Sequence, residues 1–199
     1  RFLLATGAEL SALGNPVVDG GTGANTLELT GEPGALGQFD SGLAENFGSL
    51  RISSGRWQLT GQSPGTRDVV VDRNGTLTLV APTTIDGSYS HAPPTSLVPQ
   101  PGDPEPTLQA LLSAATQDGP LLTTTGSAAL GDGLLEVIIG GGFRGQADFI
   151  LLQADGGRIN EFDRIVLPNN PDFVIGVPVY SANQISLSVN VTGYSDNQW

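Results

Sequence analysis

The chain has 199 residues, a formal net charge of −12 at pH 7, and neither cysteine nor methionine. The acidic balance argues against nucleic acid and anionic lipid as partners, because phosphate contacts need a cationic surface. The absence of cysteine excludes disulfides, thiolate metal sites and cysteine nucleophiles. With 28 glycines, 14 prolines and 14% charged residues, the composition predicts an extended, turn-rich chain with little helix. Since no methionine stands at position 1, we expect a fragment or a processed product.

Short segments that alternate apolar and polar residues fill much of the first eighty positions. Such alternation is typical of strands with one buried face, and glycine, asparagine or aspartate separates the segments. The expected strands are 26–30, 49–53, 56–60, 68–72 and 75–80. Their close spacing leaves no room for helices between them and favours a sandwich, a barrel or a solenoid.

A weak internal similarity favours the solenoid. The phrases LELTG, WQLTG and LTLVA place Leu27, Leu59 and Leu79 at comparable positions. An irregular period between about 20 and 40 residues is typical of a solenoid with loop insertions. A sandwich would normally hold more than the 6% of aromatic residues found here. We therefore predict an all-β parallel β-helix (β-solenoid), with residues 1–81 as rungs.

Residues 82–120 interrupt this pattern with a concentration of prolines, which remove hydrogen-bond donors from a sheet. We predict a surface insertion here, with one short helix over 107–115 that carries Leu108, Leu111 and Leu112 on one face. The helix either covers part of the core or docks a partner. In the second case Tyr89 and His91 join the three leucines as a partner-contact loop.

Apolar strands return after Pro120 and form a C-terminal region over 121–192. The expected strands are 134–139, 147–153, 162–167, 173–177 and 185–191, with a further one at Tyr180. The last residues, 193–199, are polar and predict a linker.

Residues with catalytic or metal-binding chemistry are few. The GGTGAN phrase resembles one copy of a calcium repeat, but Asn25 replaces the charged ligand and no second copy follows. His91 is the only histidine, and we expect it in an exposed loop without a nucleophile beside it. Asp68 and Asp72 share a strand face, which suits a glycosidase-like carboxylate pair less well than a solvated acidic face. We therefore expect no catalytic residues, no cofactor and no metal.

The order of four phrases carries a resemblance to a known family. They read GSAALGDGLLEVIIGG, ADFILLQADGGRINEFDRIVLP, VYSANQISLSVNV and YSDNQ. Together they resemble the C-terminal end of the passenger of bacterial autotransporters (type V secretion), and the upstream segments 20–31, 39–61 and 72–81 are similar to passenger repeats. The positions that match the family pattern are Phe149 to Ala154, Gly157, Ile159, Phe162, Asp163, Tyr180, Asn183, Ile185 and Leu187.

The resemblance implies a right-handed parallel β-helix whose C-terminal rungs act as an autochaperone. It further implies a location at the bacterial cell surface or outside the cell, after export through the periplasm and the outer membrane. The partners that it implies are the protein's own outer-membrane barrel, for which 193–199 would begin the linker, and the barrel-assembly machinery. The Pro-rich segment 82–120 departs from the family pattern.

We therefore expect a non-enzymatic stem that nucleates passenger folding during translocation and displays what lies upstream. Solenoid rungs are templated on their neighbours, and the first rung is the costly one to form. The expected folding-nucleus residues are Leu135, Val137, Ile139, Phe149, Leu151, Ile159, Phe162, Ile165, Tyr180, Ile185 and Leu187. Two alternatives remain open: an adhesin or self-association module that binds a host receptor or another copy through the solenoid face or the 82–120 loop, and a carbohydrate-active enzyme on the same fold.

Overall fold

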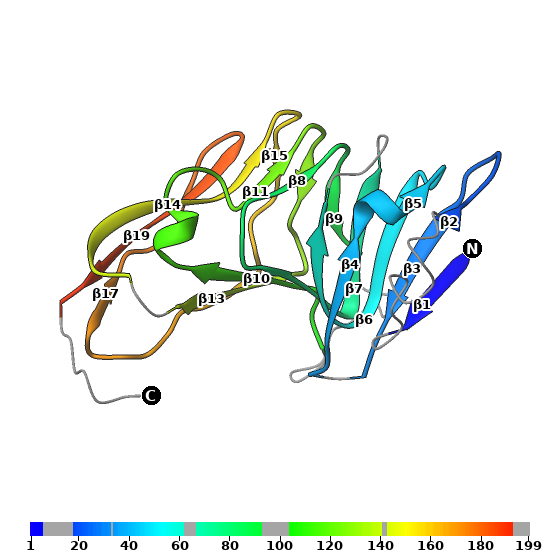
Figure 1. Ribbon diagram of the computed structural model, residues 1–199. Coiled ribbons are helices and arrows are strands. Elements are labelled where there is room, and N and C mark those ends of the chain that lie inside the picture. Colours follow the sequence, from blue (N-terminus) through cyan, green and yellow to red (C-terminus); the bar gives the residue numbers. More distant parts are fainter. Residues whose placement is uncertain (6–17, 33, 62–66, 93–103, 141–142, 193–199) are drawn as a thin grey trace.

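The computed structural model describes residues 1–5, 18–32, 34–61, 67–92, 104–140 and 143–192, and the regular structure of these residues is almost entirely β-strand (Figure 1). Within the described ranges the only helical segments are two short 3-10 turns, η2 (Ser41–Leu43) and η3 (Ala114–Thr116). The prediction of an all-β chain is therefore confirmed. The strands follow one another along the long axis of the molecule, from blue at the N-terminal end to red at the C-terminal end.

The larger of two main sheets has eleven strands, and its strands pair in parallel. Its principal path is β1 (Phe2–Ala5), β3 (Thr26–Thr30), β6 (Ser49–Thr60), β7 (Asp68–Leu79), β10 (Thr107–Leu112), β13 (Leu134–Ile139) and β16 (Arg164–Val166). Four shorter strands join it: β4 (Leu36–Asp40), β9 (Tyr89–His91), β12 (Ala128–Ala129) and β15 (Arg158–Ile159). A separate parallel pair joins β2 (Val18–Asp19) to β5 (Ala44–Glu45).

The chain returns to the same sheet in sequence order, and each pass lies beside the previous one. Trp57 pairs with Gly37 on one side and with Leu77 on the other, and Leu77 pairs in turn with Leu108. Leu135 follows beside Leu108. Apolar positions thus stack on apolar positions from pass to pass, which gives the sheet one continuous buried face.

The second sheet has six strands and changes character toward its C-terminal end. Its strands are β8 (Thr83–Ile85), β11 (Leu122–Thr124), β14 (Gly145–Ala154), β19 (Gln184–Val191), β17 (Phe173–Ile175) and β18 (Val179–Tyr180). The first three pair in parallel. β19 runs antiparallel to β14 on one side and to β17 and β18 on the other.

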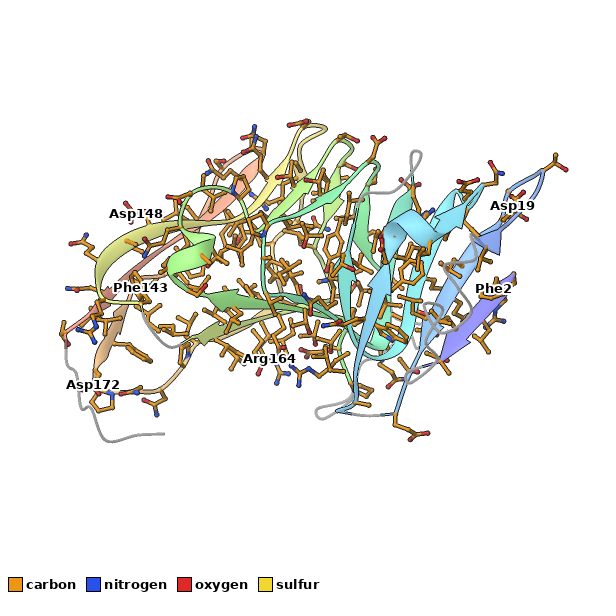
Figure 2. All side chains as sticks on the ribbon, in the orientation of Figure 1. Phe2, Asp19, Phe143, Asp148, Arg164 and Asp172 are labelled. Carbon is orange, nitrogen blue, oxygen red and sulfur yellow. The ribbon has the colours of Figure 1, made fainter. Side chains whose placement is uncertain are left out.

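A single hydrophobic core takes residues from both main sheets. Figure 2 shows side chains filling the interior along the length of the molecule. Trp57, Tyr89, Phe39 and Phe149 are the largest fully buried side chains. Burial of apolar surface of this kind is the main favourable term in folding.

The prediction of a helix over 107–115 is wrong. Residues Thr107–Leu112 form β10, which lies between β7 and β13 in the middle of the larger sheet, and only the 3-10 turn η3 follows. Leu108 and Leu112 point into the core, while Leu111, on the opposite face, is half-buried. Tertiary context overrides the local preference of these residues for a helix, because a strand at this position satisfies the backbone hydrogen-bonding groups of both neighbouring strands.

The prediction that 82–120 is a surface insertion is also wrong for most of its length. β8, β9 and β10 all belong to the two main sheets. Residues 93–103, which hold four of the prolines, lie outside the described residues, as does the predicted linker 193–199. Pro106 directly precedes β10, where no strand hydrogen bond is lost.

The expected folding-nucleus residues differ in burial. Those in the core are Leu135, Val137, Phe149, Leu151, Phe162, Ile185 and Leu187. Ile139, Ile165 and Tyr180 are partly buried and pack against it. Ile159 is 52% exposed, because its side chain points outward from β15, so it lies outside the hydrophobic core.

Candidate functional site

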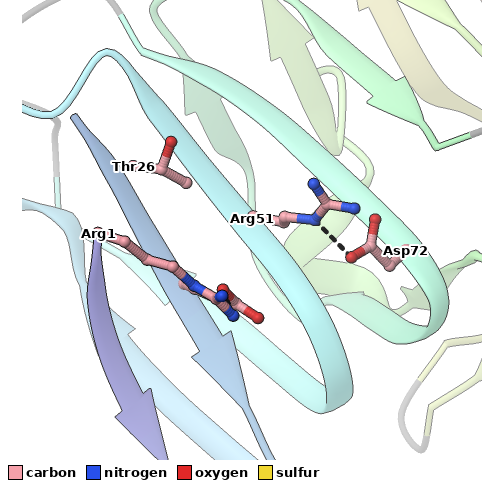
Figure 3. A pocket seen from close by; sticks show the side chains of 5 residues that line it. Arg1, Thr26, Arg51 and Asp72 are labelled. Carbon is pink, nitrogen blue, oxygen red and sulfur yellow. Dashed lines mark hydrogen bonds and ion pairs between the residues drawn. The ribbon is translucent and has the colours of Figure 1, made fainter. Parts of the chain in front are cut away.

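A charged groove of about 430 Å³ lies over the first strands of the larger sheet (Figure 3). Arg1, Glu28, Arg51 and Asp72 line it together with Thr26. Arg1 forms an ion pair with Glu28, and the Nε of Arg51 donates to Oδ2 of Asp72 at 2.5 Å. The two arginines and two carboxylates therefore neutralise one another, which leaves no free charge to hold an ionic ligand.

The carboxylates considered for a glycosidase-like pair are both engaged elsewhere. Asp72 pairs with Arg51, and the hydrogen bond to Asp72 raises the pKa of that arginine. Asp68 accepts a hydrogen bond from the backbone nitrogen of Ser88 at 2.8 Å. Each carboxylate thus serves as a structural acceptor, and the geometry gives no support to a catalytic pair.

A second groove, of about 550 Å³, lies where β6 and β7 bend. Ser54, Asn74, Glu105 and Thr107 are among its lining residues, and the rest are Gly31, Gly55, Arg73, Thr76 and Pro104. Glu105 forms an ion pair with Arg164 at 3.0 Å. Hydroxyl, amide and carboxylate groups line this groove without an aromatic platform, so it offers hydrogen bonds but no stacking surface.

A ladder of polar side chains crosses the outward face of the larger sheet. Thr78 donates to Oε1 of Gln109 at 3.2 Å, and Nε2 of Gln109 donates to Oε2 of Glu136 at 2.6 Å. Arg56 also reaches Oε1 of Gln109, at 2.7 Å. Thr78 and Gln109 are buried although they point away from the core. The ladder joins three successive passes. We therefore assign it a role in fixing the strand register and stabilising the fold rather than in binding a ligand.

The GGTGAN turn holds an amide where a calcium repeat would hold an ion. Nδ2 of Asn25 donates to the carbonyls of Gly21 at 3.1 Å, and of Gly23 and Asn46 at 3.3 Å. Asp19 accepts from the Asn46 side chain, and this bond holds the pKa of Asp19 below its ordinary value. Within the described residues, no group of three or more histidine, aspartate or glutamate side chains could hold a metal ion.

The predicted partner-contact residues lie in the interior rather than on a loop. Tyr89, Leu108 and Leu112 are fully buried, and His91 is 6% exposed. Only Leu111 reaches the surface in part. The expectation of an exposed loop histidine is therefore wrong: His91 is in β9, a strand paired with β7, so its side chain points inward. The one feature of the sequence that indicated this inward orientation was the spacing of Tyr89 and His91, which are two positions apart and therefore share a strand face.

A buried arginine directly precedes β7. Arg67 is 3% exposed and donates from Nε to the Phe47 carbonyl at 3.2 Å and from Nη2 to the Ala44 carbonyl at 2.5 Å. Burial lowers its pKa. The residue ties the start of β7 to the preceding pass, and no pattern in the sequence singled it out.

The large apolar side chains that remain exposed gather near the two ends of the molecule. Leu3 and Leu36 lie on β1 and β4 at the N-terminal edge of the larger sheet. The others are Ile138, Ile159, Val166, Val174, Val177 and Val179, from β13 onward. No described helix is long and apolar enough to cross a membrane.

Comparisons of this chain with protein-family models, with curated proteins and with solved structures give no match.

Proposed function

We propose that this chain is the non-enzymatic stem of an autotransporter passenger, folded as a right-handed parallel β-helix. In this proposal it nucleates passenger folding during translocation across the outer membrane and displays upstream domains at the cell surface. Its partners would be the protein's own outer-membrane barrel and the barrel-assembly machinery. The resemblance of residues 126–198 to that family motivates the proposal, and the repeated parallel passes of the larger sheet support it.

The observation that carries the proposal is the antiparallel pairing at the C-terminal end. β17 and β18 are close in sequence to β19 and each pairs with it, whereas the parallel pairs elsewhere join residues of successive passes. Local antiparallel pairing costs less loop-closure entropy than long-range parallel pairing, so it forms sooner. Ile185 and Leu187 are fully buried there and anchor β19 to the core. β17, β18 and β19 can therefore form first and offer the other edge of β19 to β14.

Folding kinetics of matched variants test the proposal. Ile185→Val and Ile52→Val remove the same methyl group from two fully buried positions, in β19 and β6. Each should cost about 1 kcal/mol. If the C-terminal end is the nucleus, Ile185→Val slows refolding about fivefold, while Ile52→Val leaves refolding unchanged and speeds unfolding about fivefold. Stopped-flow refolding and unfolding in urea give both rates.

The larger substitutions Leu187→Ala and Leu50→Ala replace the valine variants if those change stability by less than about 0.6 kcal/mol, because rate ratios are unreliable below that value. Equal effects on refolding at the two ends, or a larger effect at the N-terminal position, would contradict the proposed nucleus. In cells that express the natural gene, the β19 variant should also lower surface exposure of the chain to added protease more than the β6 variant does.

A further inference from the structure

The only histidine of the chain lies in a buried cluster that joins three passes of the backbone. The Tyr89 hydroxyl is 2.7 Å from Nε2 of His91, and Nδ1 of His91 is 3.2 Å from the Leu130 carbonyl oxygen. The Phe162 ring lies against the imidazole with a centroid separation of 5.6 Å. Tyr89 and His91 are in β9, Leu130 follows β12, and Phe162 follows β15.

The partners of the two ring nitrogens fix the neutral tautomer. A carbonyl oxygen only accepts, so Nδ1 carries the proton that it donates to Leu130. Nε2 then has a free lone pair and accepts from the Tyr89 hydroxyl. A second proton on Nε2 would force that hydroxyl to turn, and its own hydrogen would lose its partner inside the core.

The surroundings of the ring provide no counter-charge. On β7 the paired residue is Val71, and beneath the ring lies Gly133, where an added Cβ would come 1.7 Å from Nδ1. Tyr89 is the titratable group in contact with it. The carboxylates on the adjoining segments are Asp132, Glu161 and Asp163; all three are exposed. Among the described residues no ion pair to His91 is formed, so an imidazolium here would be a buried and uncompensated charge.

We propose that the Tyr89–His91 pair is an acid-sensitive latch, which holds three successive passes together while the ring is neutral and releases them when the ring takes up a second proton. The latch is a property of this fold and does not depend on the function proposed above. The released state carries one proton more than the closed state. Once the ring is charged, the released state is favoured because the ring regains water.

The direction and range of the response follow from linkage. Burial lowers the pKa of His91 from 6.5 to about 4. The unfolded chain therefore takes up this proton first as the pH falls, and stability is lost between pH 6.5 and about 4. The unfolding equilibrium constant should rise about 30-fold between pH 7.5 and pH 5 from this group alone. Above pH 6.5 the latch contributes fully, and below about 4 the loss is complete.

The first test uses the unaltered protein. Because the chain has a single histidine, its imidazole resonances are unambiguous in an NMR titration. We expect no titration of these resonances near pH 6.5 in the folded protein, and a change only on approach to pH 4. A midpoint near 6.5 with the native spectrum otherwise intact would overturn the proposal.

Two variants separate the latch from general acid denaturation. His91→Gln cannot be protonated and keeps a donor and an acceptor, so its unfolding constant should lack the 30-fold rise that the wild type shows at pH 5. Tyr89→Phe is the matched control: it loses the hydroxyl but keeps the titrating ring, so it remains acid-sensitive. If His91→Gln keeps the wild-type dependence on pH, the proposal is wrong.

Hydrogen exchange reports the released state directly. At pH 5, after correction for the intrinsic exchange rate, amides of Tyr89–His91 and Ala128–Ala129 should lose protection before those of β3 in the wild type but not in His91→Gln. Uniform loss of protection along the chain in both proteins would contradict a local latch. If His91→Gln does not fold at pH 7.5, the NMR titration of the wild type still decides the question.

Discussion

Truncation of three leucines in β10 distinguishes the strand from the helix that the sequence favoured. In the strand, Leu108 and Leu112 are fully buried and Leu111 points to the opposite face, where it is half-buried. In a helix over the same residues, all three would share one face. Leu108→Ala and Leu112→Ala should therefore be costly, and Leu111→Ala should not.

The magnitude follows from the neighbours of Leu108. It lies in register between Leu77 and Leu135, and ladder hydrogen bonds hold all three strands in place. The walls of the cavity left by truncation cannot close easily, so we expect a loss of about 3–5 kcal/mol. Truncation of the half-buried Leu111 should cost about 1 kcal/mol, the transfer free energy of the partly exposed methyl groups.

Equilibrium unfolding in urea, followed by far-UV circular dichroism, measures these differences. Leu111→Ala is the matched control, since it is the same substitution three positions away. A small domain has about 5–15 kcal/mol of stability in total, so Leu108→Val replaces the alanine variant if that variant does not fold. A loss at Leu111 as large as the loss at Leu108 would refute the strand and favour a helix.

Two glycines provide further predictions, both measured by urea unfolding. Gly133→Ala should cost about 2–3 kcal/mol, because its Cβ would lie 1.7 Å from Nδ1 of His91 and the ring must move. Gly48→Ala, at a site with open space, should stay within about 0.5 kcal/mol of wild type, and equal effects at the two sites would contradict the buried ring. Gly37→Ala would bring its Cβ 2.6 Å from the ring of Trp57, so we expect a loss of about 1–3 kcal/mol and a shifted indole N–H resonance; an unshifted resonance would contradict this contact.

Several strand positions were predictable because one face is buried and the other polar, although β4, which has the same burial pattern, was not expected. The segments predicted at 26–30 and 134–139 coincide with β3 and β13. The segments 49–53 and 56–60 are one strand, β6, because Gly55 takes a φ of 77° and bends the chain without ending its pairing. A glycine between two alternating runs therefore indicated a bend, and the sequence alone did not distinguish a bend from a turn.

Stacking register was not predictable from local phrases. The phrases LELTG and WQLTG suggested that Leu27 and Leu59 occupy equivalent positions, but Leu27 pairs with Leu50 and Leu59 pairs with Phe39. A parallel ladder constrains which residues are neighbours, not which phrases look alike. Without that register, the Thr78–Gln109–Glu136 ladder had no signal in the sequence beyond three polar positions on separate strands.

The buried histidine was missed because nearby prolines dominated the interpretation of its segment. Tyr89 and His91 alternate with Ser90 as strand residues do, and their inward face meets Gly133, which leaves room for a ring. A polar ring enters a core when both nitrogens find partners, and those partners came from Leu130 and from Tyr89. One of them is 39 positions away, so only the folded chain brings it into reach.

The C-terminal end differs from the rest of the molecule in strand direction, because its strands pair antiparallel and the others pair in parallel. The alternation of apolar and polar residues over 185–191 predicted a strand. It did not indicate whether that strand runs parallel or antiparallel to its neighbours, since side chains alternate in the same way in both. Antiparallel pairing gives β19 partners on both edges, β14 on one side and β17 with β18 on the other. Each parallel pass of the larger sheet, in contrast, needs a neighbouring pass as its template. Local pairing of β17 and β18 with β19, beside passes that pair only with distant segments, is the asymmetry that a directional folding mechanism requires.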